Sequence, residues 1–271
     1  MKPSRYLLAA VMLLAWTPWS CPAETVVEYG LGATSLHFPH YPGSEQSHTF
    51  ALPFPYLTVR SERLEIDDNE MRGVLAGRGV VSLELSAGGA LPVDASDNRA
   101  REDMPDLSWL GEIGPALRFA PVDQSDGAWR YALELPLRRV FELDGTNIST
   151  TGWTLSPNIQ ARRELASARD NWEIHLRLST RFGTSRYHEH FYGVPDELAT
   201  DDRPAYRARG GFINYQASMG LSWRRNNWWA GGFVNHSSFR GSKSADSPLM
   251  TTDSHYSAGI AVARIIGRRE F

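Results

Sequence analysis

Residues 235–239, with the sequence NHSSF, bring together a histidine and two serines, the residue types of a hydrolytic nucleophile and its base. A serine hydroxyl attacks an ester only when a neighbouring base takes its proton. Adjacent residues on a strand point to opposite faces, so His236 pairs more easily with Ser238 than with Ser237. A third group that orients the histidine would have to come from another strand. We therefore favour a polar cluster at a rim or in a lumen over an active site, and we assign no catalytic residue.

His188 and His190 stand two residues apart in the stretch YHEH. On a strand they would share a face, and two imidazoles with a carboxylate can hold a metal ion. The segment is predicted as an exposed loop, however, where histidines commonly bind no metal. We predict no metal site and no cofactor.

Charged side chains with a regular spacing are the third candidate for chemistry. In NWEIHLRLSTRF, residues 171–182, most residues that alternate with Trp172 in steps of two are apolar. Those that alternate with Glu173 in steps of two are charged or polar. A strand with this pattern has one apolar face and one charged face. The charges predicted to face inward from this and similar strands are Glu112, Arg118, Arg130, Glu134, Arg138, Arg162, Glu173, Arg177, Arg181 and Arg224, and Glu84 has the same parity.

These inward charges have two interpretations. They form either the selectivity lining of a channel for an anionic or mixed-charge solute, or a plug in which long side chains fill a narrow lumen by pairing with each other. Acidic and basic residues are interspersed, which favours the plug.

Segments of about ten residues with this period of two recur along the chain between polar turns, a pattern typical of a transmembrane β-barrel. A soluble barrel or sandwich also alternates. A membrane barrel, however, places aromatic residues at strand ends, where they meet the two membrane–water interfaces. The seven tryptophans beyond residue 23 lie at or near predicted strand ends: Trp109, Trp129, Trp153, Trp172, Trp223, Trp228 and Trp229. The aromatic Phe271 at the end of the sequence resembles the end of many bacterial outer-membrane barrels.

The strand count follows from the alternation of short inner turns and longer outer loops, with both ends of the barrel domain on the inner side. Segments 240–254, 184–209, 142–151 and 92–106 are predicted outside, and 225–227, 164–170, 121–128 and 77–79 inside. The region 62–76 then holds two short strands around the turn DDNE, residues 67–70. We predict an all-β, antiparallel up-and-down barrel of about 12 strands, with ten strands and a different pairing as the alternative.

Residues 1–23 have the features of a cleaved secretory signal peptide: Lys2 and Arg5, an apolar run at 6–16, and small residues before a cleavage point after Ala23. Without them the formal net charge changes from −3 to −5 and the single cysteine, Cys21, is lost. An acidic chain is unsuited to nucleic acid. We predict one domain, residues 24–271, in the bacterial outer membrane and in contact with its lipid.

Two proline-containing stretches are unusual for a barrel. Pro42 and Gly43 mark a turn in YPGS, residues 41–44. In LPFPYL, residues 52–57, Pro53 and Pro55 remove two hydrogen-bond donors from a strand, which suggests an irregular rim or a bulge.

These two stretches together resemble the start of the MltA-interacting protein (MipA/OmpV) family of Gram-negative outer-membrane proteins. The resemblance continues in order through LPLRRVFELDG (135–145), FYGV (191–194), GGFINYQASMGLSW (210–223) and ADSPL (245–249), although Phe191-Tyr192 reverses the aromatic order expected for the family. The motif residues singled out are Tyr41, Pro42, Gly43, Ser44, Pro53, Pro55, Asp246, Ser247 and Pro248.

The resemblance implies an outer-membrane barrel without agreed catalytic residues. It also implies a non-enzymatic scaffold that brings a murein transglycosylase together with a murein synthase in the cell envelope. A porin-like channel for small solutes is the alternative, and a lipid-modifying enzyme that uses His236 is a third possibility.

Overall fold

The computed structural model describes residues 25–60, 64–66, 71–121, 128–167 and 169–271. The expected signal peptide and the predicted turn at 67–70 lie outside these residues. The strands are β1 (Val26–Pro39), β2 (Ser47–Arg60), β3 (Leu64–Ile66), β4 (Met71–Arg78), β5 (Val81–Ala90), β6 (Trp109–Phe119), β7 (Arg130–Asp144), β8 (Asn147–Leu155), β9 (Asn158–Ala166), β10 (Asn171–Gly183), β11 (Gly211–Arg225), β12 (Trp228–Ser238) and β13 (Ser254–Glu270). The helices are η2 (Ala95–Asp97), η3 (Arg99–Arg101), α1 (Ser185–Tyr192) and η4 (Asp196–Leu198).

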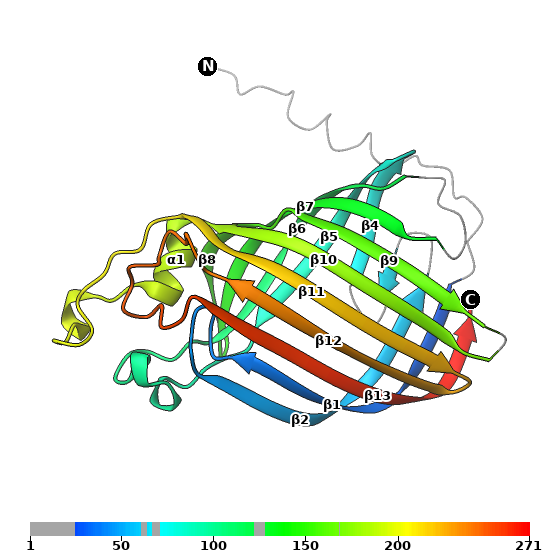
Figure 1. Cartoon of the computed structure of the whole chain (residues 1–271), viewed down its shortest axis with the longest axis horizontal. Helices are drawn as coiled ribbons and strands as arrows, with labels where there is room; N and C mark the ends of the chain where they lie inside the picture. The colour runs from blue at the N-terminus through cyan, green and yellow to red at the C-terminus, as the bar shows by residue number, and fades with distance from the viewer. Residues whose placement is uncertain (1–24, 61–63, 67–70, 122–127, 168) are drawn as a thin grey trace, which may run out of the picture.

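The strands form one closed antiparallel barrel in which sequence neighbours pair and β13 pairs back to β1 (Figure 1). β8 and β9 occupy one position in the wall, because both pair with β7 on one side and β10 on the other. Pro157 separates them, since proline has no N–H to offer the ladder. The thirteen elements therefore make twelve strand positions, as predicted. No helix in the described residues is long and apolar enough to cross a membrane.

Side chains on the wall alternate between an apolar exterior and a polar interior. On β10, Leu178 is 65% exposed and points outward, whereas His175 is 9% exposed and points into the lumen. The buried polar residues include four glutamates on inward faces, Glu28, Glu84, Glu112 and Glu134. This distribution is the inverse of that in a water-soluble protein and is typical of a transmembrane barrel.

Both ends of the described chain lie at the same end of the barrel, which we call the inner end. There Thr25 and Phe271 exchange two backbone hydrogen bonds of 3.0 Å. Turns at this end include the two-residue connections between β4 and β5 and between β11 and β12. The long connections after β5, β10 and β12 lie at the opposite, outer end, as predicted (Figure 1).

Two details of the wall differ from the prediction. The segment 142–151 is a hairpin that continues β7 and β8, with Gly145 at φ +56° in its turn. Its polar residues still take part in the backbone ladder, where Glu142 pairs with Ser149 and Asp144 with Asn147. Ile213 has the same parity as the outward-facing Tyr215, which alternation alone would place on the outer face, but it is fully buried inside. The β10–β11 register shifts at Phe182, and this bulge turns Ile213 toward the lumen.

Candidate functional site

The outer half of the lumen contains an ion-pair group centred on Glu112 of β6. Its carboxylate is 6% exposed and pairs with Arg181 of β10, and Arg138 of β7 lies 3.7 Å away. The Thr154 hydroxyl donates a hydrogen bond of 3.4 Å to the same carboxylate. Four neighbouring strand positions, those of β6, β7, β8 and β10, are therefore linked through one buried anion.

The inner half of the lumen carries further ion pairs. Arg118 pairs with Glu134, which also accepts a hydrogen bond of 2.6 Å from Gln160, and Arg118 lies 4.0 Å from Glu84. The remaining pairs are Arg162 with Glu173 at 3.0 Å, Arg130 with Glu164, and Arg224 with Glu28. Arg177 lies on the same inward face of β10, between Glu173 and Arg181.

All ten charges proposed for the lumen thus lie on inward faces, and most of them pair with an opposite charge. Sequence reasoning missed their partners Glu28 and Glu164, although both obey the same alternation on β1 and β9. A buried carboxylate is stable only when paired and hydrogen-bonded. This arrangement favours the plug interpretation of the lumen.

The opposite side of the lumen is apolar. β1, β2 and β12 line a pocket of about 320 Å³ with Leu36, Phe54, Tyr56, Trp229 and Phe233. The Trp229 ring lies 5.5 Å from the Tyr56 ring and is only 7% exposed. The prediction that Trp229 faces the membrane interface is therefore wrong, because its neighbour Trp228 takes the outward direction on β12.

The other six tryptophans lie in two groups at the ends of the wall. Trp109 and Trp153 are near the outer end, and Trp129, Trp172, Trp223 and Trp228 are near the inner end. Several have polar partners: Arg163 lies 6.0 Å over Trp129, Arg264 lies 5.8 Å over Trp228, and the Trp223 indole donates to Asp170 at 3.0 Å. A ring with one polar partner and one apolar face suits a membrane–water interface.

The two histidine clusters do not form the sites considered from sequence. His188 and His190 lie on helix α1, not on a strand, so they do not share a face. His188 is fully buried and contacts Ser244 at 2.7 Å and the Gly211 carbonyl at 3.2 Å. Across the described residues, no group of three or more potential ligands is arranged to hold a metal.

His236 and Ser238 share the outward face of β12, whereas Ser237 is buried in the lumen. The His236 ring packs 4.7 Å from the ring of Tyr256, which also faces outward. The two residues therefore lie on one face as the alternation requires, but that face is the barrel exterior.

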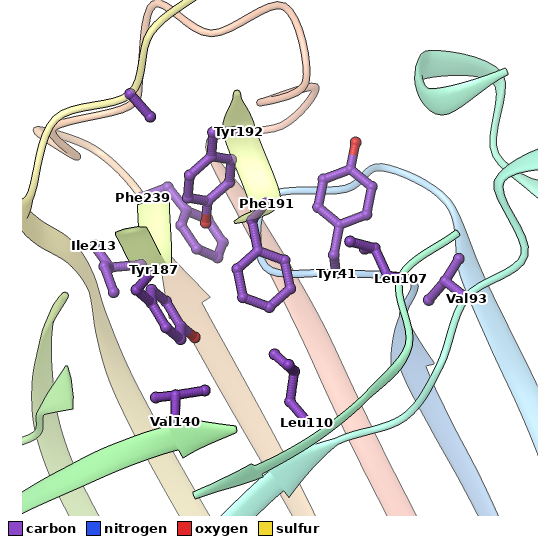
Figure 2. Close-up of a cluster of buried hydrophobic side chains, with 11 residues drawn as sticks. Tyr41, Val93, Leu107, Leu110, Val140, Tyr187, Phe191, Tyr192, Ile213 and Phe239 are labelled. Carbon is purple, nitrogen blue, oxygen red and sulfur yellow. The ribbon is translucent and has the colours of Figure 1, made fainter. Parts of the chain in front are cut away.

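The outer end of the barrel is closed by a cap of packed loops. Tyr41, Tyr187, Phe191, Tyr192 and Phe239 come from three separate segments and form one buried hydrophobic cluster (Figure 2). Arg101 is 3% exposed beneath these loops, donates 3.2 Å hydrogen bonds to the Phe191 and Pro105 carbonyls, and lies 5.7 Å over the Tyr41 ring. Sequence reasoning missed the cap because its contacts join loops distant in the chain.

The residues that carry the family resemblance meet in this cap. The Tyr41 hydroxyl donates to the Leu249 carbonyl at 2.8 Å, and the Tyr192 hydroxyl donates to the Pro42 carbonyl at 3.0 Å. Ser247 donates to the Tyr192 carbonyl at 2.7 Å. Burial raises the pKa of Tyr41 to about 12, so the phenol keeps the proton that it donates.

The remaining motif residues lie in the same loops, except for the two prolines of β2. Gly43 adopts φ +88°, with the Met250 side chain where a Cβ would project, so a larger residue is excluded there. Ser44 is buried and accepts a hydrogen bond from Asn98 at 3.1 Å. Asp246 is exposed and Pro248 is partly buried beside Ser247. Pro53 and Pro55 lie in β2, which pairs with β1 without a register shift, so the predicted bulge is absent.

Acidification is expected to loosen the cap around α1. Burial lowers the pKa of His190 to about 4, with Arg101 adding to the effect, and burial also lowers the pKa of His188. In an opened cap, histidine titrates near 6.5. Between about pH 6.5 and pH 4 the opened form therefore binds protons that the closed form does not, and the closed form loses stability as the pH falls.

Hydrogen exchange of residues 185–192, corrected for the intrinsic effect of pH, is expected to be faster at pH 5 than at pH 7. The variant His190→Gln is expected to reduce this difference. Equal protection at both pH values in the unsubstituted protein would contradict the expectation.

Comparison with known proteins identifies the family. The family model described as MltA-interacting protein MipA matches residues 31–266. No curated protein sequence matches the chain. A solved bacterial polysaccharide outer membrane secretin is similar at a TM-score of 0.38 and 8% identity, covering 92% of this chain and 99% of that one.

A Pseudomonas aeruginosa FadL homologue is similar at a TM-score of 0.30 and 9% identity, covering 81% of this chain and 61% of that one. OmpT of Vibrio cholerae is similar at 0.27 and 9%, covering 91% and 99%. These likenesses are too distant to indicate a function. The family match spans nearly the whole chain and agrees with the closed barrel, and the chain therefore belongs to the MltA-interacting protein MipA family, as a β-barrel of the outer membrane.

Proposed function

We propose that this barrel is a non-enzymatic scaffold that holds a murein transglycosylase, and with it a murein synthase, at the inner face of the outer membrane. The family name supports a partner of this kind. The observation that carries the proposal here is the composition of the inner end. Its exposed side chains include five arginines, Arg78, Arg169, Arg225, Arg268 and Arg269.

These arginines form a basic rim at the end of the barrel that faces the periplasm. Among the described residues, Arg268 pairs with Glu270 at 2.7 Å and lies 4.0 Å from Glu28, and Arg225 lies 4.0 Å from Asp170. Exposed positive charge of this kind steers and orients an acidic protein surface. The outward apolar belt would meanwhile contact lipid.

The interior gives little support to the alternative functions. A small-solute channel needs a continuous path, whereas ion-paired side chains project into this lumen and packed aromatic residues close its outer end. For a lipid-modifying enzyme, the His236 ring packs on the Tyr256 ring at the barrel exterior.

A binding experiment with matched variants tests the scaffold proposal. The detergent-solubilised barrel is expected to bind a purified murein transglycosylase from the same organism, more weakly as salt rises. The double variant Arg268→Glu/Arg269→Glu is expected to reduce the affinity at least tenfold, because two attractive charges become repulsive. Surface plasmon resonance measures the change.

The matched control is Arg207→Glu/Arg209→Glu, which reverses two exposed arginines in an outer loop. It is expected to leave the affinity unchanged. Absence of binding by the unsubstituted barrel, or equal losses in both double variants, would contradict the proposal.

A further inference from the structure

Among the described residues, one side of β2 has little strand pairing in the outer half of the barrel wall. β2 pairs with β1 along its whole length, but on its other side only Val59 and Arg60 pair with β3. β5 pairs with β4 no further outward than Ser86. Among the described residues, no strand therefore joins β2 from Ser47 to Thr58 with the outer end of β5. We call this gap the window.

The sequence of β2 is suited to a free edge. Pro53 and Pro55 have no N–H to offer a neighbouring strand, and prolines protect unpaired edges from pairing with other chains. Leu52 has the inward parity of β2 and is nevertheless 43% exposed. The outer border of the window is held closed, because Gln46 donates to the Asp97 carbonyl at 3.1 Å and accepts a hydrogen bond from the Arg99 amide at 2.8 Å.

A pocket of about 300 Å³ lies behind the window, between the cap and the lumen. Its lining includes His48 and Phe50 from one border of the window and Gly89, Ala90 and Leu91 from the other. Phe38 also lines it, and its ring lies 6.0 Å from Phe233 in the apolar pocket deeper in the lumen. The size of the pocket and its largely apolar lining are those of a small-molecule site.

The pocket also has polar and basic lining residues, of which Arg181 is ion-paired with Glu112. None of its described lining residues is acidic, whereas Arg181, His40, His48 and His255 all contribute. Arg181 Nε and His255 Nδ1 are buried and have no hydrogen-bond partner among the described residues. Buried polar atoms in native proteins nearly always have partners, so a polar group of a ligand in this pocket would satisfy two otherwise unpaired atoms.

We propose that this pocket binds a single-chain amphiphile with an acidic head, of the fatty-acid class, which enters from the membrane through the window. The carboxylate lies against Arg181 and His255. The acyl chain lies along Phe38, Phe50 and Leu91 and leaves through the window toward lipid. This inference is independent of the scaffold proposal, since it concerns the outer half of the wall and not the inner rim.

Photolabelling of the reconstituted barrel tests the site. In phosphatidylcholine nanodiscs, a photoreactive palmitate analogue is expected to label residues 48–56 and 87–93 saturably, with competition by unlabelled palmitate. Ala90→Trp, which fills the pocket beside the window, is expected to reduce this saturable labelling at least tenfold. Ala217→Trp, which adds the same ring to the exposed outer face, is the matched control and is expected to leave it unchanged.

The head group is tested separately. His255→Leu is expected to weaken competition by palmitate at least fivefold, and hexadecanol is expected to compete poorly with the unsubstituted protein. Heat-modifiable migration on gels checks that each variant folds. Labelling that is unsaturable, spread around the outer belt and insensitive to Ala90→Trp would overturn the site, and equal competition by hexadecanol would overturn the acidic head.

Discussion

Replacing Glu112 with glutamine is expected to lower the free energy of unfolding of the barrel by about 3–5 kcal/mol, the usual effect of removing one partner from a buried ion pair. Glu112 is 6% exposed and is the common partner of Arg181 and Arg138. Without its charge, two guanidinium groups remain close together in the lumen with no compensating anion. Urea titration of the detergent-solubilised protein, followed by tryptophan fluorescence, measures the loss.

The matched control is Glu164→Gln. Glu164 is also an inward carboxylate paired with one arginine, Arg130, but both side chains are 42% exposed. Solvent screens such a pair, so the expected loss is about 1 kcal/mol or less. Similar losses at the two positions would show that burial does not determine the strength of the ion pairs in the lumen. That result would contradict the plug interpretation.

The second large effect is expected in the cap. Tyr192→Ala removes a fully buried aromatic ring that packs beside Phe191 and bonds to the Pro42 carbonyl. Truncations of this kind lower stability by about 3–5 kcal/mol. The cap is expected to open separately from the wall, so trypsin cleavage at exposed Lys243 is expected to accelerate by about 100-fold or more, at about 1.4 kcal/mol per factor of ten.

Tyr192→Phe separates packing from hydrogen bonding, since it loses only the bond to Pro42, worth about 1 kcal/mol. Its cleavage is expected to accelerate by about tenfold or less. Equal acceleration in the two variants would contradict the role of the ring. Single-channel current steps from the unsubstituted barrel in a planar bilayer would contradict a closed cap altogether.

The inward charges were predictable because alternation along a strand is a local property. Once Glu173 and Arg177 share a parity, their common face follows from backbone geometry alone. The partner of each charge was harder to predict from the sequence, since an ion pair such as Arg224 with Glu28 joins residues 196 positions apart. Only the barrel closure between β13 and β1 brings them together.

Other features depended on departures from regular geometry. A single bulge in the β10–β11 register turned Ile213 inward, and no residue type there marks a bulge. Trp229 was a different kind of error, because its neighbour Trp228 already required that the two rings point in opposite directions. α1 and the cap rest on contacts between separate loops, and the window depends on which strands remain unpaired, so local patterning predicted neither.

The pairing of β13 with β1 bears on how such a molecule is assembled. The first and last strands are separated by more than two hundred residues, and contacts this distant form slowly. Until β13 pairs with β1, the sheet has two unpaired edge strands whose amides and carbonyls can hydrogen-bond to strands of other proteins. A product truncated before Ser254 is therefore expected not to close into a smaller barrel. It is expected to remain an open sheet with unpaired edges, which aggregates unless chaperones bind it or proteases degrade it.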